Sequence, residues 1–366
     1  MSEQTVPEKS NKAVITWLYM VVVLIMILAV FGGFVRLTRS GLSIVEWNPI
    51  TGVIPPLNEE AWQTEFAKYQ QTPEFQKINY NMTLFEYKEI FWLEFIHRLI
   101  ARFAGLFVVI PIFYFIFKGT IPWRKSGPFL LIGLLFGFQG FMGWYMVSSG
   151  LVDNPTVDHF RLTFHLLIAL LLLGLTLWLA LRYTYRFPKL SRNQFKSAGF
   201  IMAVFLFIVL IIQITYGGFV AGLKAGYVSN TWPLMAGRLI PVGLLSTFES
   251  ALENFLSAPL TVHFIHRWFS FAVLLVAILL YYVAKRKNYA NAITKSVMIF
   301  IALAVIQISL GISVVWFGVP LVLALTHQAA ALLLYVASII IVYQILHEPV
   351  TAPVPQTEKE LKPTTA

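Results

Sequence analysis

Five histidines of this sequence stand inside long apolar stretches, where an ionisable side chain is costly and usually has a function. They are His97, His165, His263, His266 and His327. Neutral imidazole is a good ligand for haem iron, which can bind one imidazole on each face of the ring. The chain contains no cysteine, so thiolate metal sites and iron–sulfur clusters are excluded. Histidines that meet in pairs would therefore ligate haem.

Membrane-spanning helices must position these histidines. Of the 366 residues, 58% are hydrophobic and only 12% are charged, and the mean hydropathy is +0.74. A soluble globular protein has roughly twice that charged fraction, so a water-soluble enzyme is excluded. We predict an all-α integral membrane protein with eight transmembrane helices. The predicted spans are 13–35, 89–117, 126–152, 159–182, 197–223, 257–284, 296–317 and 320–346.

The short connections between the spans predict the orientation. Three of them, 118–125, 182–196 and 285–295, are rich in lysine and arginine and contain no Asp or Glu. Because such loops stay on the cytoplasmic side, both termini are expected in the cytoplasm. The net charge of +10 has the same explanation, and no nucleic-acid partner is expected. Two long outer loops, about 38–88 and 224–256, could form lids.

Motifs recur in the same order in the two halves of the chain. Gly32-Gly33-Phe34-Val35 recurs as Gly217-Gly218-Phe219-Val220, Phe95-Ile96-His97-Arg98 as Phe264-Ile265-His266-Arg267, Gln139…Gly143 as Gln307…Gly311, and His165 as His327. Four spans per half is an even number, so the halves share an orientation and a parallel internal repeat is expected. The predicted architecture is two pseudo-symmetric four-helix bundles, 13–185 and 196–347. A cytoplasmic tail, 1–12, precedes them and a disordered tail, 348–366, follows.

Four of the histidines are expected at one depth on the even-numbered helices. Counted from the predicted outer helix ends, His97, His165, His266 and His327 lie about six to nine residues in, or roughly 9–14 Å deep at ~1.5 Å per residue. Facing side chains from two helices of a bundle are a common way to hold a cofactor. A lone membrane histidine is more often a hydrogen-bonded packing residue. The common depth and the repeat are what favour one haem in each half.

The halves differ three residues before the first histidine of each pair, where Glu94 corresponds to His263. Residues i and i+3 share a helix face, so Glu94 is expected beside His97. There a carboxylate could move protons or stabilise positive charge; alternatively, it pairs with Arg98. The asymmetry favours a reactive first half and an electron-transfer haem in the second.

Other polar residues of the spans have two expected kinds of role. Arg98 and Arg267 directly follow a proposed ligand, and each could bind haem propionates or extend to the outer headgroups. Gln139, Gln213 and Gln307 are expected to form interhelical hydrogen bonds.

These motifs resemble the haem A synthase family over about residues 13–347. The most specific segments are Gly32-Gly33-Phe34-Val35-Arg36-Leu37-Thr38-Arg39-Ser40-Gly41-Leu42-Ser43, Glu46-Trp47-Asn48-Pro49, Thr51-Gly52-Val53-Ile54-Pro55-Pro56 and Glu94…His97-Arg98. The long first outer loop is similar to that of the Gram-negative and mitochondrial branch of the family. Another branch carries a cysteine pair in that loop, which this chain lacks.

The resemblance implies oxidation of haem O to haem A, in which the C8 methyl is hydroxylated twice and water is lost to leave a formyl group. On matching positions, it implies that His97 and His165, with Arg98, bind the substrate haem and that Glu94 is catalytic. It also implies that His266 and His327 are the axial ligands of a haem b cofactor. Arg267 is a further candidate for binding that cofactor. The implied location is the cell inner membrane.

The implied partners are haem O, the haem O synthase that supplies it, membrane lipid and an electron-transfer partner; a homo-oligomer is compatible with this interpretation. Two other classes of protein stay open as alternatives. A bis-histidine dihaem b cytochrome would carry electrons without chemistry of its own and would have no use for Glu94. A transporter with parallel repeats would need broken helices near the midplane, whereas the ionisable residues here lie toward the outer third.

Overall fold

The structure is a computed structural model that describes residues 12–185 and 192–348. Over these ranges the regular secondary structure consists of helices, without a named strand. The predicted N-terminal tail (apart from Lys12) and C-terminal tail (apart from Glu348) lie outside the described residues. Part of the basic connection 182–196 lies outside them as well.

Eight long helices in the described part of the chain are long and apolar enough to cross a membrane, which confirms the predicted number of spans. They are α1 (Lys12–Leu37), α4 (Leu84–Phe117), α5 (Gly127–Ser148), α6 (His159–Thr184), α8 (Ala198–Gly222), α10 (Pro259–Arg286), α11 (Asn291–Trp316) and α12 (Leu321–Leu346). Multi-pass membrane insertion follows from their length and composition.

Helix α4 begins five residues before the predicted start, at Leu84 instead of residue 89. A capping box fixes this start: the Glu86 backbone N–H donates to the Thr83 hydroxyl, and the Thr83 backbone N–H donates to the Glu86 carboxylate at 2.8 Å. The first two turns carry Glu86 and Lys88 and are therefore too polar to be found from hydropathy. The helix thus begins before the predicted span, and the boundary of the span itself stays a prediction.

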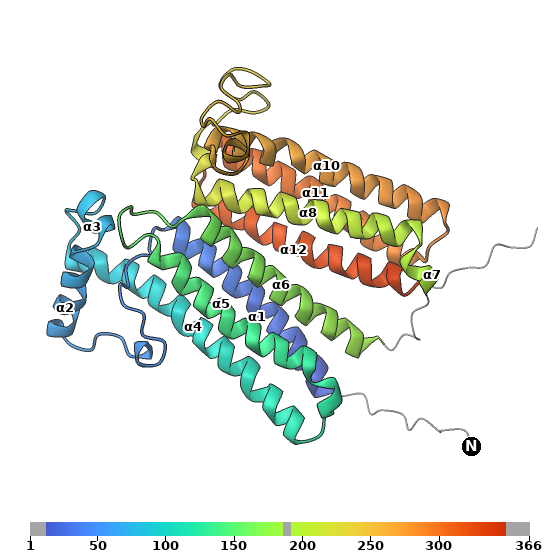
Figure 1. The fold of residues 1–366 in the computed structure, drawn as a ribbon, viewed down its shortest axis with the longest axis horizontal. Helices are drawn as coiled ribbons and strands as arrows, with labels where there is room; N and C mark the ends of the chain where they lie inside the picture. Colours follow the sequence, from blue (N-terminus) through green and yellow to red (C-terminus); the bar gives the residue numbers. More distant parts are fainter. Residues whose placement is uncertain (1–11, 186–191, 349–366) are drawn as a thin grey trace, which may run out of the picture.

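The two long outer segments contain short helices. The first holds η1 (Thr51–Val53), α2 (Glu59–Gln70) and α3 (Pro73–Lys77), and the second holds η3 (Ala225–Tyr227) and α9 (Ala251–Ser257). Both segments lie at the same end of the molecule (Figure 1). The shorter η2 (Trp123–Lys125) and α7 (Arg192–Phe195) belong to connections at the opposite end.

An aromatic cluster packs α2 and α3 onto the first turns of α4. Its buried members are Trp62, Phe66, Tyr69, Tyr87, Phe91 and Phe95. The Tyr69 and Tyr87 rings stack with their centroids 5.0 Å apart. Burying several aromatic rings gives this outer segment a small core of its own.

The spanning helices form two groups, α1, α4, α5, α6 and α8, α10, α11, α12 (Figure 1). In the first group α1 and α5 each pack against α4 and α6, and in the second α8 and α11 each pack against α10 and α12. The groups meet where α1 contacts α12 and where α6 contacts α8 and α12. Each contact has its counterpart in the other half, which supports the predicted repeat; the symmetry axis itself stays a prediction.

The main apolar core occupies only one half of the length of the helices. On each helix that carries one of the four histidines, the buried members of this core lie beyond that histidine, toward the end opposite α2 and α3. On α6, for example, they run from Leu170 to Leu181, whereas His165 precedes them. The level of the histidines is therefore outside the densest apolar packing.

Candidate functional site

Each of the four histidines lies against a glycine of the neighbouring helix. The pairs are Gly32–His97, Gly143–His165, Gly217–His266 and Gly311–His327. A Cβ added at these glycines would stand 3.0–3.3 Å from the nearest ring atom, so the absence of a side chain allows the close approach. One glycine and one histidine thus join α1 to α4, α5 to α6, α8 to α10 and α11 to α12.

The four rings lie at one level when they are counted from the helix ends opposite α2 and α3. His97 and His266 precede the last residue of their helices by 20 residues, and His165 and His327 by 19. From the other end the counts disagree, because α4 extends into the outer aromatic cluster and His97 lies 13 residues after Leu84. The predicted count of about six to nine residues is therefore wrong for His97, although the expected common level agrees with these positions.

The structure brings together the histidines that the sequence paired. In the second half the His266 and His327 ring centroids are 6.3 Å apart, with the rings nearly perpendicular at 83°. In the first half His97 and His165 are close enough to interact electrostatically. The Phe31 ring lies 5.7 Å from that of His97. Each half thus offers two imidazoles from alternate helices.

Glutamines contact three of the four histidines. The side-chain amide nitrogens of Gln139, Gln213 and Gln307 lie 3.2, 3.2 and 3.4 Å from ring nitrogens of His165, His266 and His327, respectively. The predicted interhelical hydrogen bonds are confirmed. The contacts of these glutamines with the histidines were not predicted from the sequence. The sequence feature that could have indicated these contacts is the position of the glutamines, since each stands four residues before the glycine that lies against the histidine.

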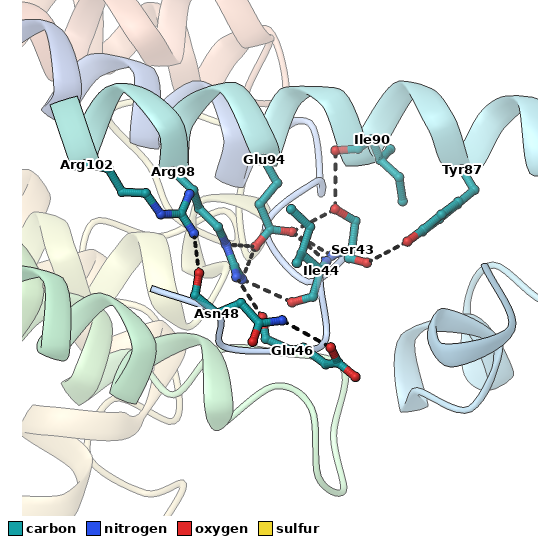
Figure 2. Close-up of polar contacts among 9 residues, drawn as sticks. All are labelled: Ser43, Ile44, Glu46, Asn48, Tyr87, Ile90, Glu94, Arg98 and Arg102. Carbon is teal, nitrogen blue, oxygen red and sulfur yellow. Dashed lines mark hydrogen bonds and ion pairs between the residues drawn. The ribbon is translucent and has the colours of Figure 1, made fainter. Parts of the chain in front are cut away.

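Glu94 is buried, with 2% of its surface exposed, and it pairs with Arg98 (Figure 2). Its Oε1 accepts from Arg98 Nε at 3.0 Å and Nη2 at 2.6 Å. Its Oε2 accepts from the Ser43 hydroxyl at 2.7 Å and from the backbone N–H groups of Ser43 and Ile44 at 2.8 and 2.9 Å. The ion pair is therefore the role that the structure displays, and a catalytic role of Glu94 stays a proposal.

Arg98 also attaches the first outer segment to α4. Its Nη2 donates to the Ile44 carbonyl at 3.1 Å and its Nη1 to the Glu46 carbonyl at 3.3 Å. One turn further along α4, Arg102 donates to the carbonyls of Asn48 and Pro49 (Figure 2 shows the first of these). Two arginines thus hold the segment from Ile44 to Pro49 along the side of the helix.

Arg267 makes the corresponding contacts in the second half. Its Nη2 and Nη1 donate to the carbonyls of Ser229 and Thr231, each at 2.8 Å, and its Nε donates to His263 Nε2 at 3.0 Å. Arg98 and Arg267 therefore each bind two carbonyls spaced two residues apart. This arrangement was not predicted from the sequence. The sequence feature that the two places share is a tryptophan, Trp47 or Trp232, directly after the second carbonyl of each pair.

Several features of the described residues fit a haem held between the paired imidazoles. In His165 and His327, Nε2 contacts a glutamine, whereas Nδ1 on the other side of the ring is buried without a hydrogen-bond partner. The buried residues of the main apolar core lie beyond the histidines and not at their level. The structure places no three His, Cys, Asp or Glu of residues 12–185 and 192–348 where they could hold a bare metal ion. Two imidazoles alone suit an iron whose other ligands come from a porphyrin.

A second carboxylate, Glu74 on α3, is buried in the outer segment. The Tyr69 hydroxyl donates to it at 3.3 Å, and Asn79 donates to that hydroxyl at 2.8 Å. Burial raises the pKa of Glu74 to about 7. The negative charge of Glu94 raises this pKa further, whereas the Tyr69 hydrogen bond and two nearby cations lower it.

Comparison with known proteins identifies relatives over most of the chain. Residues 15–339 match the family described as cytochrome oxidase assembly protein. A Heme A synthase from Rickettsia felis is 40% identical over 325 residues, which cover 88% of this chain and 96% of the relative. Heme A synthases from Mesorhizobium japonicum and from the Wolbachia of Brugia malayi are 42% and 39% identical, covering 88% and 90% of this chain and 88% and 95% of their own lengths. The chain therefore belongs to the cytochrome oxidase assembly protein family.

Proposed function

We propose that this protein is a haem A synthase, an oxidoreductase that converts the C8 methyl group of haem O into the formyl group of haem A. The reaction comes from the relatives, which are named Heme A synthase and align over nearly their whole length. The observation that carries the proposal is the pair of unequal sites within one chain. Each has two imidazoles, but the arginine beside the first pairs with a carboxylate and the arginine beside the second with a histidine.

The first half, 13–185, is the proposed substrate half. His97 and His165 would hold the haem O substrate between α4 and α6, with Arg98 as a further binding residue. Glu94 is the proposed catalytic carboxylate, because it lies one turn from His97 on the same face of α4. It would hold or accept a proton when the methyl group is oxidised.

The second half, 196–347, is the proposed cofactor half. His266 and His327 would be the axial ligands of a haem b, and Arg267 is a further residue for binding it. This haem would supply one-electron redox chemistry. The chain's own contribution is to fix the two imidazoles and to keep them away from the outer water. His263 takes the place of the carboxylate there and pairs with Arg267.

The outer segments have a proposed role in covering the sites. Three hydrogen bonds to the Glu94 carboxylate tie Ser43 and Ile44 to the face of α4 that bears His97. Arg267 ties Ser229 and Thr231 to α10 in the same manner. These attachments would restrict the access of water to the haem at each site.

The proposed location is the cell inner membrane, with both termini in the cytoplasm and the histidines toward the outer side. Haem O is poorly soluble, so it would enter from the lipid or from a docked haem O synthase. Oxidation of the methyl group is proposed to require an electron-transfer partner. The two halves are proposed to be related by an axis along the membrane normal, and a homo-oligomer is compatible with this arrangement.

The test is extraction and chromatography of the haems bound to the purified full-length protein. Haem B together with haem O or haem A is expected. Haem B alone, at two per chain, would instead favour the dihaem electron carrier. A colourless protein from cells with sufficient iron would contradict both functions.

A further inference from the structure

Each outer segment contains a loop of exposed apolar residues directly after the carbonyls that an arginine holds. In the first half it is residues 47–57 (the first loop), and in the second half it is residues 232–245 (the second loop). Ile50 and Leu57 expose 83% and 80% of their surfaces, and Ile240 and Val242 expose 69% and 73%. The described part of the chain therefore leaves these four side chains largely uncovered.

The two loops are counterparts in the internal repeat. Three residue types recur in them 185 positions apart, which is also the spacing between the repeated glycine pairs: Trp47 and Trp232, Gly52 and Gly237, Pro56 and Pro241. The loops project sideways from α4 and α10 on opposite flanks of the molecule (Figure 1, blue and gold). Exposed apolar residues thus occur at the same place in both halves.

The contacts of the loops with α4 and α10 place them at membrane depth. Arg102 donates to the carbonyls of Asn48 and Pro49, and the Trp232 ring stacks on that of Phe271 with the centroids 6.0 Å apart. Arg102 and Phe271 each lie 15 residues before the last residue of their helix, or about 22 Å at ~1.5 Å per residue. With these helix ends at the inner surface of a hydrocarbon layer about 30 Å thick, both contacts lie within its outer third.

The backbone of the loops is suited to the boundary between headgroups and acyl chains. The Gly52 N–H donates to the Asn48 carbonyl at 3.1 Å, and Met235 and Arg238 exchange two backbone hydrogen bonds at 2.7 and 3.2 Å. Five positions have no N–H to satisfy, namely Pro49, Pro55, Pro56, Pro233 and Pro241. Irregular backbone is excluded from the lipid-exposed centre of a bilayer, whereas the boundary region offers water to the remaining polar groups.

The charges of the surrounding sequence agree with this level. Residues 47–58 contain no charged residue, and Arg238 is the one charged residue of the second loop. The first charges after the first loop are Glu59 and Glu60, where α2 begins. An arginine can bind a lipid phosphate, whereas the carboxylates of α2 suit the water outside the membrane.

We propose that the first and second loops are interfacial anchors, which insert their apolar side chains into the outer leaflet on the two flanks of the protein. The partner is phospholipid, with acyl chains around Ile50, Leu57, Ile240 and Val242. Because Arg98 and Arg267 attach the same outer segments to α4 and α10, the anchors would hold these segments at the level of the lipid. This inference needs the membrane insertion of the helices and does not depend on the proposed reaction.

The experiment uses the purified full-length protein in vesicles of phosphatidylethanolamine and phosphatidylglycerol. The chain has no cysteine, so Ile50→Cys and Ile240→Cys each carry a single nitroxide spin label. Glu60→Cys on the exposed first turn of α2 is the water control, and Ile110→Cys on an exposed position of α4 is the lipid control. Electron paramagnetic resonance measures collisions of each label with oxygen, which concentrates in lipid, and with a nickel chelate, which stays in water.

The labels at positions 50 and 240 are expected to collide with oxygen more often, and with the nickel chelate several times less often, than the label at position 60. These values should place them about 5–10 Å inside the interface, nearer to the surface than the label at position 110.

Collisions with the nickel chelate equal to those at position 60 would overturn the proposal, because the loops would then lie in water. Labels that neither reagent reaches and that broaden one another's spectra would overturn it as well, since a second copy of the chain would then cover the loops. Leu57→Cys and Val242→Cys decide the same point if the first variants do not accumulate. A protein that lacks haem but gives the expected collisions would overturn the proposed function and leave the anchors in place.

Discussion

The Arg98 guanidinium binds the Glu94 carboxylate through two of its nitrogens, and both side chains belong to successive turns of α4. The pair is almost enclosed, with 14% and 3% of the two side chains exposed. The same carboxylate accepts from the backbone of Ser43 and Ile44. One ion pair thus connects the outer segment with the helix that carries His97.

Replacement of Glu94 by alanine is expected to abolish haem A formation while haem remains bound. It also leaves Arg98 buried without its partner, which costs about 3–5 kcal/mol in comparable buried pairs. Haem chromatography measures the product, and limited proteolysis measures the attachment of residues 38–58. Arg98→Gln is the control, because it breaks the same ion pair and keeps the carboxylate. If both variants lose haem A in proportion to the loosening of the segment, Glu94 acts only through its structural contacts.

Removal of a single imidazole is expected to affect the two halves differently. His266→Ala and His327→Ala should lose haem B, because the resident haem then lacks an axial ligand. His97→Ala and His165→Ala should keep haem B and lose haem O and haem A. Haem extraction with a pyridine haemochrome assay gives these ratios. His159→Gln serves as the control, since its ring contacts the Leu256 carbonyl at 3.2 Å instead of another helix histidine; a loss of haem B from His97→Ala would contradict the assignment of the halves.

The glycines beside the histidines are expected to tolerate no methyl group. In Gly143→Ala the new Cβ would stand 3.3 Å from His165 Cε1, so the ring must move by a few tenths of an ångström. Gly140→Ala on the same helix is the control, because nothing lies within 4 Å of its Cβ. Alanine is favoured over glycine in a helix by about 1 kcal/mol, so the control should be at least as stable as the wild type.

The two measurements for this pair of variants are the amount of haem bound in the first half and the electron paramagnetic resonance signal of that haem when it is oxidised. Gly143→Ala should weaken or alter both, whereas Gly140→Ala should leave them unchanged. The same comparison applies to Gly311→Ala, where the Cβ would stand 3.0 Å from the ring of His327. Equal behaviour of Gly143→Ala and Gly140→Ala would mean that the close approach does not matter for ligation.

The stability of the outer segment is expected to fall as the pH rises. Burial raises the pKa of Glu74 from an ordinary value of 4.5 to about 7. Between these values the folded protein binds more protons than the unfolded chain, so its free energy of unfolding decreases with increasing pH. The contribution is fully present below pH 4.5 and is lost as the pH passes through about 7.

Glu74→Gln should remove this dependence, because the amide carries no charge at any pH. The melting temperatures of the variant and the wild type should agree near pH 4.5 and diverge toward pH 8, where the variant is more stable. Glu60→Gln, which changes an exposed carboxylate on α2, is the control. A constant difference between Glu74→Gln and the wild type from pH 4.5 to pH 8 would contradict the raised pKa.

The eight spans were predictable because each is long, apolar and bounded by charged or turn-forming residues. The start of α4 was not, since its first two turns carry Glu86 and Lys88, which interrupt the apolar pattern. The short helices α2 and α3 were not predicted either, because their aromatic residues form a core only where the segment packs against α4.

The sequence by itself determined the chemistry that is available: the paired histidines, the absence of thiols, the unmatched Glu94 and the glutamines. Hydropathy and repeated motifs reveal such features because they depend on residue type and on spacing along one chain. Only the tertiary structure decided the contacts, such as Arg98 on the carbonyls of Ile44 and Glu46, or Gln213 on the ring of His266. These contacts join residues about 50 positions apart, and their geometry arises from how the helices pack, which no local pattern specifies.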